Sequence, residues 1–237
     1  MMEPYAQFLV DFNRKHGDRT YHNSTENTRA AVIVETRPDF FLPKVIRNVM
    51  YFLGAGWNLH VLTSSQNRDF VLRALPGWDV HVDILDLPGY WFPRERYNQL
   101  LLMPSFWELF REEKILVFQT DALLAGPGID DFLDYDLVGA PFRSFDANYL
   151  ANGGLSLRNR QAMLDCLART RPAENEWEDA FFSDGVRALG GKMPDVHEAS
   201  RFSVESIYTT HPVGVHGTNQ YIHHLDVARK ITDAIRY

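Results

Sequence analysis

The chain of 237 residues has a single cysteine, Cys166, and fewer basic than acidic side chains. One cysteine cannot form an intrachain disulfide or supply a cysteine-rich zinc site. Its position in an apolar helical pattern predicts a small core residue. Lys and Arg together number 24, against 31 Asp and Glu, which gives a formal net charge of -7. Because nucleic-acid binding needs a basic face, we expect no nucleic-acid partner.

Long apolar runs are also missing. No stretch approaches the roughly 20 apolar residues that cross a bilayer. The first residues carry Glu3 and Asp11 around a short apolar patch, which is not the pattern of a signal peptide. We therefore expect a cytoplasmic protein with no transmembrane segment. Peripheral contact with a membrane surface stays open.

Two glycine-rich phosphate-binding motifs are absent. The first expected strand, 30–35, runs directly into Glu35-Thr36-Arg37 without a glycine-rich turn, and no P-loop is present. Apolar strand patterns nevertheless alternate with helical patterns. Strands are expected at 30–35, 58–63, 80–84 and 114–121, and helices at 43–53, 69–75 and 95–113. A kink at Pro104 is the alternative to a straight helix in the last of these. This alternation favours an α/β domain whose mostly parallel central sheet is flanked by helices.

The second half of the chain is less regular. A short strand is expected at 136–142, and Asn152-Gly153-Gly154 reads as a turn that precedes another strand. Helices are expected at 160–169, from Trp177 to Gly190, and at 226–237. We divide the chain into a leader with one short helix at 1–29, a single main domain at 30–217, and a helical tail at 218–237.

Asp121 stands out among the acidic residues. It follows the apolar run Ile115-Leu116-Val117-Phe118, which is typical of a strand buried on both faces. Ligand chemistry in α/β sheets lies at the carboxyl ends of such strands. Burying a carboxylate without a partner costs several kcal/mol, so donors or a cation should lie nearby. The alternative is an aspartate that caps a helix or a turn.

Four motifs follow one another along the chain. They are FQTD at 118–121, NGGLSLR at 152–158, EDxFFS at 178–183 and PVGVH at 212–216. In this order they resemble glycosyltransferases of the GT-A fold and, more narrowly, an uncharacterised bacterial glycosyltransferase-like family. The resemblance runs from about 30 to 217. It implies a GT-A-like (Rossmann-like) fold and an enzyme that moves a sugar from a nucleotide-sugar donor to a hydroxyl of a bacterial surface glycan or another glycoconjugate.

The resemblance also implies a divalent metal, Mn²⁺ or Mg²⁺. In the fold, a strand-end Asp-x-Asp motif holds a metal that bridges the two phosphates of the donor. The matching triplet here is Gln119-Thr120-Asp121, so an amide replaces the first acid. Such metals often use only one or two carboxylates plus substrate phosphates. Asp121 and His216 are the expected ligands. The alternative for His216 is a loop histidine bonded to backbone.

The leaving diphosphate needs positive charge whether or not a metal is present. Preorganised cations or donors must stabilise the negative charge that grows on the leaving group. Three arginines are spare cations for this purpose, although each by itself is expected to be a solvated surface residue. They are Arg96, Arg143 and Arg158.

The resemblance assigns two further groups of residues. Glu178 and Asp179 are expected to begin a helix, where neighbouring side chains point about 100° apart. Only one of them can then act as the general base of an inverting transfer. Asp179 is preferred, and Glu178 is the reserve. Retention is not excluded. The donor nucleotide and sugar are expected to contact residues from four segments, namely Glu35, Thr36, Arg37, Tyr97, Asn98, Gln119, Thr120, Asn152, Gly153 and Gly154.

Two other functions compete with glycosyl transfer. A nucleotidyltransferase that makes sugar nucleotides uses a similar sheet, but it normally carries the glycine-rich loop that is missing here. A non-catalytic nucleotide- or sugar-binding module of the same fold is favoured by the amide of Gln119 in place of an acid. Turnover of a sugar nucleotide distinguishes an enzyme from a binding module.

Overall fold

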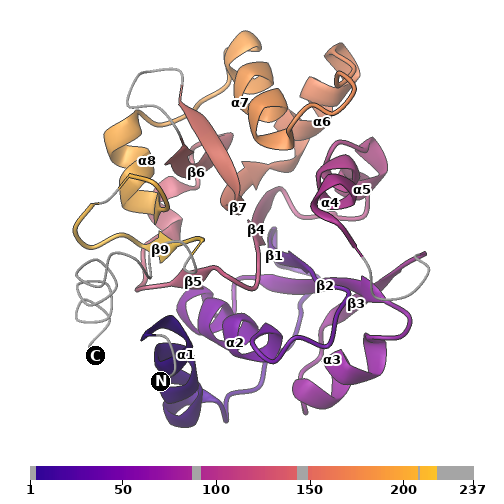
Figure 1. Ribbon diagram of the computed structural model, residues 1–237, viewed down its shortest axis with the longest axis vertical. Coiled ribbons are helices and arrows are strands. Elements are labelled where there is room, and N and C mark those ends of the chain that lie inside the picture. The colour runs from indigo at the N-terminus through magenta and orange to yellow at the C-terminus, as the bar shows by residue number, and fades with distance from the viewer. Residues whose placement is uncertain (1–3, 87–91, 143–148, 208, 218–237) are drawn as a thin grey trace.

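A computed structural model describes residues 4–86, 92–142, 149–207 and 209–217. Its centre is a six-stranded sheet in the order β3-β2-β1-β4-β7-β6 (Figure 1). The strands are β1 (Arg29–Val34), β2 (Asn58–Ser64), β3 (His81–Leu85), β4 (Lys114–Phe118), β6 (Leu137–Phe142) and β7 (Leu150–Asn159). Strands β1 to β4 pair in parallel, and β7 runs antiparallel to β4 and β6. The predicted α/β class with a mostly parallel central sheet is confirmed.

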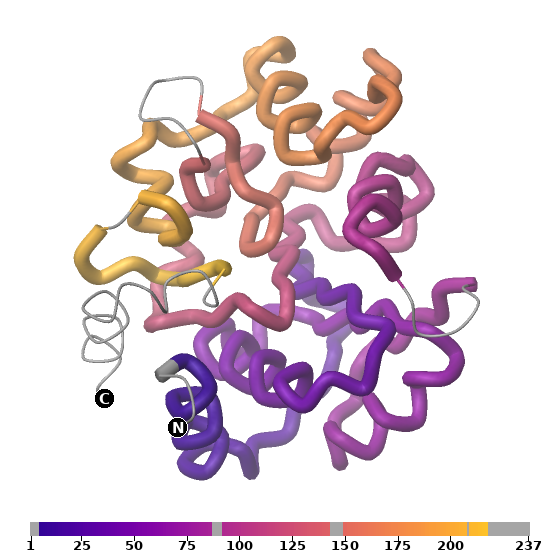
Figure 2. The backbone as a smooth tube through the Cα atoms, in the orientation of Figure 1, coloured from indigo at the N-terminus to yellow at the C-terminus, as the bar shows by residue number. Residues whose placement is uncertain are grey.

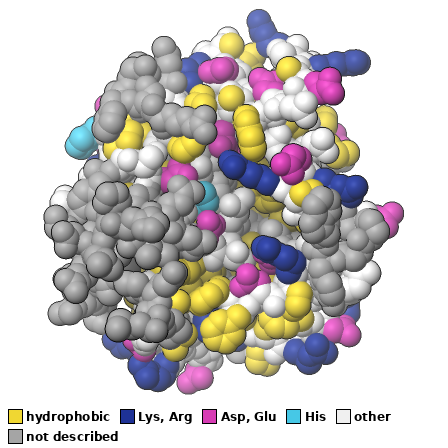
Figure 3. All heavy atoms as spheres, viewed as in Figure 1, with side chains coloured by type: hydrophobic (Ala, Val, Ile, Leu, Met, Phe, Trp, Pro, Cys, Tyr) yellow, Lys and Arg dark blue, Asp and Glu magenta, His cyan; other side chains and the backbone are white. Residues whose placement is uncertain are grey.

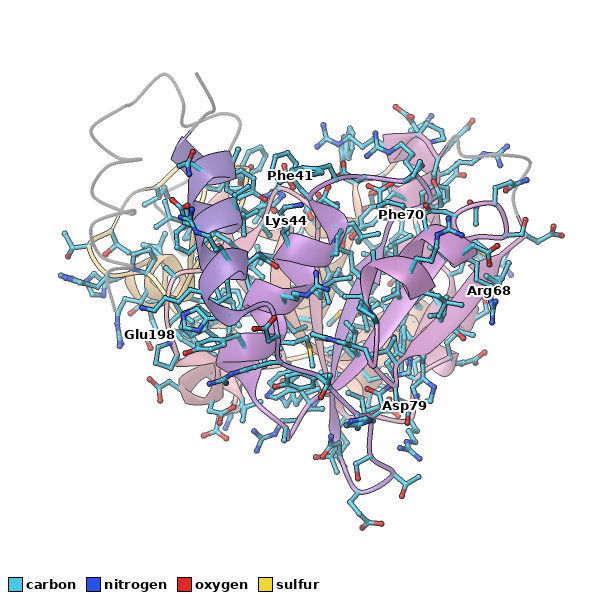
Figure 4. The ribbon with its side chains drawn as sticks, turned by 90° about the horizontal axis from the view of Figure 1, so that it is seen from below. Phe41, Lys44, Arg68, Phe70, Asp79 and Glu198 are labelled. Atoms are coloured by element: carbon cyan, nitrogen blue, oxygen red, sulfur yellow. The ribbon has the colours of Figure 1, made fainter. Side chains whose placement is uncertain are left out.

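Helices cover both faces of this sheet. Figure 1 shows α1 to α3 on one side of β1–β3, and α4 and α5 on the other. The view from below shows α1, α2 and α3 side by side, with Phe41 and Lys44 at the start of α2 and Phe70 on α3 (Figure 4). The helices are α1 (Pro4–His16), α2 (Leu42–Leu53), α3 (Arg68–Ala74), α4 (Arg94–Leu101), α5 (Pro104–Glu108), α6 (Arg160–Arg169), α7 (Glu178–Ala188) and α8 (Val196–Phe202), with a 3-10 turn η1 (Ile129–Phe132).

Strand β1 and helix α2 illustrate how the pattern gives the fold. Residues 30–34 are apolar and buried because both faces of β1 are covered. Helix α2 buries Val45, Ile46 and Val49 along one stripe, the spacing of an amphipathic helix. Gly54 ends α2 at φ 75°, a conformation that disfavours residues with a Cβ.

A second, three-stranded sheet was not predicted. It has the order β5-β9-β8, with β5 (Leu123–Leu124), β9 (Gly214–Val215) and β8 (Ser203–Val204). Leu123 pairs with Val215. Figure 2 shows the segments at 203–207 and 209–216, in yellow, beside the chain that follows β4. This pairing carries the end of the described chain back to the turn that contains Asp121.

The predicted helix at 95–113 is wrong as a continuous element, and the break falls at Pro104, where a kink was the alternative. The chain forms α4, breaks at Leu102 and Met103, and resumes as α5 at Pro104. Proline has no N–H for the helical ladder, and it forces the preceding residue toward extended backbone. Met103 accordingly has φ -96° and ψ 129°. The indole of Trp107 donates to the Leu101 carbonyl at 2.8 Å, which satisfies an acceptor freed by the break.

The predicted turn at Asn152-Gly153-Gly154 is also wrong. These residues lie within β7, which continues without interruption from Leu150 to Asn159. The pairing of β7 with β6 shifts register between Gly139 and Pro141, opposite this segment. The glycines therefore serve close approach by neighbouring groups, and no reversal of the chain occurs there.

The predicted helix near the amino terminus is present as α1. It packs against α2, and Leu9 is fully buried in the main core. The predicted helix at 226–237 lies outside the described residues, and the proposed division into leader, domain and tail stays a prediction. Within the described part of the chain, no helix combines the length and hydrophobicity needed to cross a membrane.

Strand order fixes where a ligand can bind. The chain builds outward from β1 through β2 to β3 and then returns to place β4 on the other side of β1. In open α/β sheets, ligands bind beyond the carboxyl ends of the strands at such a switch point. Asp121, three residues after β4, and Glu35, directly after β1, both lie at this position.

A charged cluster lies at the opposite, amino-terminal end of these strands. His60 in β2 is 7% exposed and is placed between two acids, with Nε2 3.4 Å from Glu112 Oε1 and Nδ1 3.7 Å from Asp83 Oδ2. Burial lowers the pKa of His60, but Asp83 and Glu112 outweigh it and raise that pKa above its ordinary value. Burial disfavours the Glu112 carboxylate, yet His60 and Asn58 lower its pKa to about 2.

The cluster predicts a pH-dependent contribution to folding. Because the folded pKa of His60 is raised, its contribution is complete below the unfolded value and is lost as pH rises through the folded value. The stability difference between wild type and His60→Gln should therefore be larger at about pH 5.5 than at about pH 9. Chemical denaturation at both pH values measures it. His197→Gln, at an exposed position of α8, is the control; an equal effect of His60→Gln at both pH values contradicts the account.

Candidate active site

A polar cavity of about 950 Å³ lies beyond the carboxyl ends of β1 and β4. In the space-filling view, histidine, acidic and basic side chains gather in the central hollow of the molecule (Figure 3). Segments far apart in the sequence line the cavity. The lining includes nearly all of the predicted site residues, namely Glu35, Thr36, Arg37, Tyr97, Asn98, Gln119, Thr120, Asp121, Asn152, Gly154, Glu178, Asp179 and His216. Gly153 lies between two of the lining residues.

The predicted metal ligands lie close together. His216 Nε2 is 3.4 Å from Asp121 Oδ1 and 3.3 Å from Gln119 Oε1. The turn after β4 is held by the Ala122 N–H, which donates to the Gln119 carbonyl at 3.0 Å, and by the Tyr5 hydroxyl, which donates to the Thr120 carbonyl at 2.6 Å. His216 follows β9, and its N–H donates to the Val204 carbonyl.

The surroundings of Asp121 favour its ionised form. Burial disfavours the carboxylate, but the hydrogen bond and charge of His216 outweigh burial and lower the pKa of Asp121 below its ordinary value. The other ring nitrogen of His216, Nδ1, lies 3.8 Å from Glu205 Oε1. Glu205 is 4% exposed and also lines the cavity. This separation is longer than a hydrogen bond, so Glu205 is a neighbouring carboxylate of the ring and not a hydrogen-bond partner of it.

The donor set fits a divalent cation only with Gln119 included. Among the described residues, no three His, Cys, Asp or Glu side chains are grouped as a metal site. Asp121, His216 and the Gln119 amide oxygen do converge, and carboxylate, imidazole and amide oxygen are all ligands of Mn²⁺ or Mg²⁺. An incomplete protein shell is compatible with metals that complete it with water and substrate phosphates.

Residues after β1 form one wall of the cavity. The Glu35 carboxylate accepts hydrogen bonds from the Arg37 backbone N–H and from its guanidinium, all at 2.9 Å. The Thr63 hydroxyl donates to the Glu35 carbonyl, and the Ser64 hydroxyl donates to the Thr36 carbonyl. Arg37 is thereby held at the rim with 64% of its side chain exposed, where a phosphate or ribose could reach it.

Helix α4 contributes Tyr97 and Asn98. The Asn98 amide donates to the Glu176 carbonyl and its oxygen accepts from the Glu178 N–H, both at 2.6 Å. Asn98 therefore fixes the start of α7, and contact with a nucleotide stays a prediction. The Tyr97 hydroxyl is shielded from solvent. Burial and the negative charge of Glu178 raise the pKa of Tyr97.

The structure separates the roles of Glu178 and Asp179. Glu178 forms a two-point ion pair with Arg158, at 2.7 Å and 3.1 Å. Asp179 Oδ1 accepts the Gly153 N–H at 2.7 Å. Burial first, and then the charge of Glu178, raise the pKa of Asp179 well above its ordinary value.

The expectation of solvated surface arginines is wrong for Arg158. Its side chain is 1% exposed and fully paired with Glu178, so it is no spare cation for phosphate. Arg96 is exposed and does not line the cavity, while Arg143 lies outside the described residues. Among the described residues, the arginines that line the cavity are Arg37 and Arg94.

Sequence reasoning missed several lining residues. The guanidinium carbon of Arg94 lies 4.3 Å from the centre of the Trp177 ring, and Trp177 is 47% exposed. Glu205, Asp39 and Phe142 also line the cavity. None of these residues stands in a recognisable motif. The position of Trp177 directly before Glu178 is the only signal that pointed to it.

Gly153 and Gly154 make the close packing of these groups possible. A Cβ on Gly153 would lie 2.6 Å from Arg158 Nη2 and 2.7 Å from Asp179 Oδ1, and closer still to Glu178 Oε1. A Cβ on Gly154 would lie 2.5 Å from His216 Cδ2 and closer still to Nε2. The charged groups of α7 and the His216 ring thus occupy the space that side chains at 153 and 154 would fill.

A methyl group at Gly153 should therefore destabilise the protein. Overpacking typically costs about 1–3 kcal/mol, and here the displaced groups are buried and charged. We expect Gly153→Ala to lower the free energy of unfolding by at least that order, as measured by urea denaturation. Gly56→Ala is the matched control because its Cβ would meet open space. Equal stability of the two variants would show that the packing at Gly153 is not as described.

Solved structures similar to this chain include two glycosyltransferases. One is the apo form of GlyE from Streptococcus pneumoniae, with 13% sequence identity and a TM-score of 0.42. The match covers 89% of this chain and 65% of the GlyE chain. The other is the galactosyltransferase LgtC in complex with donor and acceptor sugar analogs, with 12% sequence identity and a TM-score of 0.46. The match covers 87% of this chain and 95% of the LgtC chain.

A third similar structure is the 4-diphosphocytidyl-2C-methyl-D-erythritol synthase from Anaerococcus prevotii, with 9% sequence identity and a TM-score of 0.45. The match covers 69% of this chain and 83% of the synthase chain. At these identities the activities of the three proteins are not transferred to this chain. A search of curated proteins gives no match. Residues 81–216, more than half of the chain, match one family profile, and the chain belongs to that family, which is described as "Protein of unknown function (DUF5672)".

Proposed function

We propose that the protein is a metal-assisted glycosyltransferase that moves a sugar from a nucleotide-sugar donor to a hydroxyl of a glycan or glycoconjugate. One observation carries the proposal: a candidate metal cluster and a buried acid with a raised pKa meet at adjacent residues of one strand. His216, beside Asp121, contacts Gly154, and Asp179 contacts Gly153. The cavity that they share lies where α/β sheets bind nucleotides.

The donor diphosphate is proposed to lie beside Asp121, Gln119 and His216. These residues would hold a Mn²⁺ or Mg²⁺ ion, which would supply positive charge to the leaving diphosphate. Arg37 is paired with Glu35, but it is exposed at the rim and would present its remaining N–H donors on the side of β1. The nucleoside would then extend along Glu35 and Thr36.

Asp179 is proposed as the general base. It would take the proton of the acceptor hydroxyl as the oxygen forms a bond to the anomeric carbon. The bond from that carbon to the diphosphate breaks, and its electron pair leaves with the phosphate oxygen. A raised pKa suits this role because it makes the ionised carboxylate a stronger proton acceptor than an ordinary aspartate.

The first test measures nucleotide binding. Nucleoside diphosphates with Mn²⁺ should raise the melting temperature of wild type, since a ligand bound only to the native state stabilises by about 2.7 kcal/mol at a hundredfold excess over Kd. Asp121→Asn should abolish the dependence on Mn²⁺. Asp165→Asn, at an exposed position of α6 outside the cavity, is the control. A metal-dependent shift that persists unchanged in Asp121→Asn would contradict this site.

The second test measures turnover with a panel of nucleotide sugars. Asp179→Asn keeps the shape of the side chain but removes the proton acceptor, so kcat should fall by about 10²- to 10⁴-fold with little change in donor affinity. Asp184→Asn, at a 75% exposed position of the same helix, should be neutral.

The products of that panel separate the competing functions. Release of a nucleoside diphosphate with transfer of the sugar supports the proposal. Formation or cleavage of the sugar nucleotide with pyrophosphate would indicate a nucleotidyltransferase. Binding without turnover of any donor would indicate a non-catalytic module, which Gln119 in place of an acid favours.

A further inference from the structure

Three charged side chains from two elements converge beside Gly153. Arg158 comes from β7, and Glu178 and Asp179 come from the first turn of α7. All three approach the position that a Cβ of Gly153 would occupy. The two carboxyl groups of α7 therefore lie near each other, with the guanidinium beside them.

The guanidinium of Arg158 is fully engaged inside the protein. Its Nη1 and Nη2 donate to the two oxygens of Glu178, and its Nε donates to the Ser156 hydroxyl at 2.8 Å. The Arg158 guanidinium carbon lies 5.6 Å from the centre of the Trp107 ring and 5.4 Å from that of Phe182. Arg158 is thus too buried and too constrained to bind a ligand directly.

The two acids of α7 have unequal partners. Both Glu178 oxygens receive hydrogen bonds from a cation, whereas Asp179 Oδ1 receives one from the neutral N–H of Gly153. An arginine at bidentate geometry strongly favours an ionised carboxylate. Glu178 is therefore committed to Arg158, and Asp179 is the less constrained acid of the two.

We propose that Arg158 and Glu178 are positioning residues: Arg158 fixes Glu178 in a two-point ion pair, so that Asp179 is the acid that exchanges the proton at this site. This inference rests on the proposed function for its catalytic meaning. During transfer, the acceptor O–H proton passes to the Asp179 carboxylate while an electron pair of the acceptor oxygen forms the bond to the anomeric carbon. The bond from that carbon to the diphosphate breaks, and its electron pair leaves on the phosphate oxygen. Asp179 then returns the proton to solvent.

The groups that face Asp179 determine the direction of each test. They are Glu178 on its own helix, Arg158 and the Gly153 N–H on β7, and Tyr97 on α4. Burial and the charge of Glu178 raise the pKa of Asp179, and Arg158 and Gly153 lower it. Removing the charge of Glu178 should lower that pKa, and removing the charge of Arg158 should raise it.

The experiment follows the carboxyl carbon of Asp179 by NMR as a function of pH in the ligand-free protein, with Asp179→Asn to assign the signal. Glu178→Gln should move the titration of Asp179 down by about one pH unit or more, the usual effect of a neighbouring charge. Arg158→Met should move it up. Asp184→Asn is the control on the exposed face of α7 and should leave it unchanged.

The variants guard against loss of folding. If Arg158→Met does not fold, Arg158→Lys replaces it. Because lysine keeps the charge, Asp179 should titrate near the wild-type value in Arg158→Lys while it shifts in Glu178→Gln. If the ion pair of Arg158 with Glu178 serves folding alone, these variants would have a lower melting temperature and an unchanged titration of Asp179. An unshifted titration of Asp179 in Glu178→Gln overturns the inference.

A second readout separates this inference from the proposed function. The acidic limb of kcat/KM against pH should move with the NMR titration in Glu178→Gln, for any donor that is turned over. Shifted titrations without turnover of any sugar nucleotide would reject the proposed function and retain the division of roles between the acids. If a sugar nucleotide is turned over but the acidic limb of the kcat/KM profile does not move in Glu178→Gln, the division of roles between the two acids is rejected and the proposed function is retained.

Discussion

The absence of side chains at Gly153 and Gly154 is the constraint on which the candidate site depends. These residues lie within β7, at the level where α7 and the end of β9 approach the central sheet. Atoms of Glu178, Asp179 and Arg158 fill the space beside Gly153, and the His216 ring fills the space beside Gly154. A single methyl group at either position would separate groups that the proposed chemistry requires together.

The topology brings the remaining groups to this point. The switch between β1 and β4 places the turn of Asp121 next to the loop of Glu35 and Arg37. The small sheet then returns His216 to Asp121 through the pairing of β5 with β9. The cavity is therefore built where strand ends, the loops that follow them and the start of a helix meet.

The sequence predicted the parts of the site that have a local signature. Asp121 follows a buried apolar strand, so its position at the sheet edge could be inferred. Local rules failed where distant partners decide. Asn-Gly is a strong turn signal, yet close packing against α7 keeps Asn152 and Gly153 in a strand. Arginine is rarely buried, and Arg158 is buried because of Glu178, a partner that spacing alone does not reveal.

The most direct test of the account is a crystal structure of the protein with a nucleoside diphosphate and Mn²⁺. The account predicts the diphosphate beside Asp121 and His216, with anomalous density for the metal between them and the phosphates, and the nucleoside toward Glu35. Nucleotide bound elsewhere on the surface, or an empty cavity at saturating nucleotide, would contradict it.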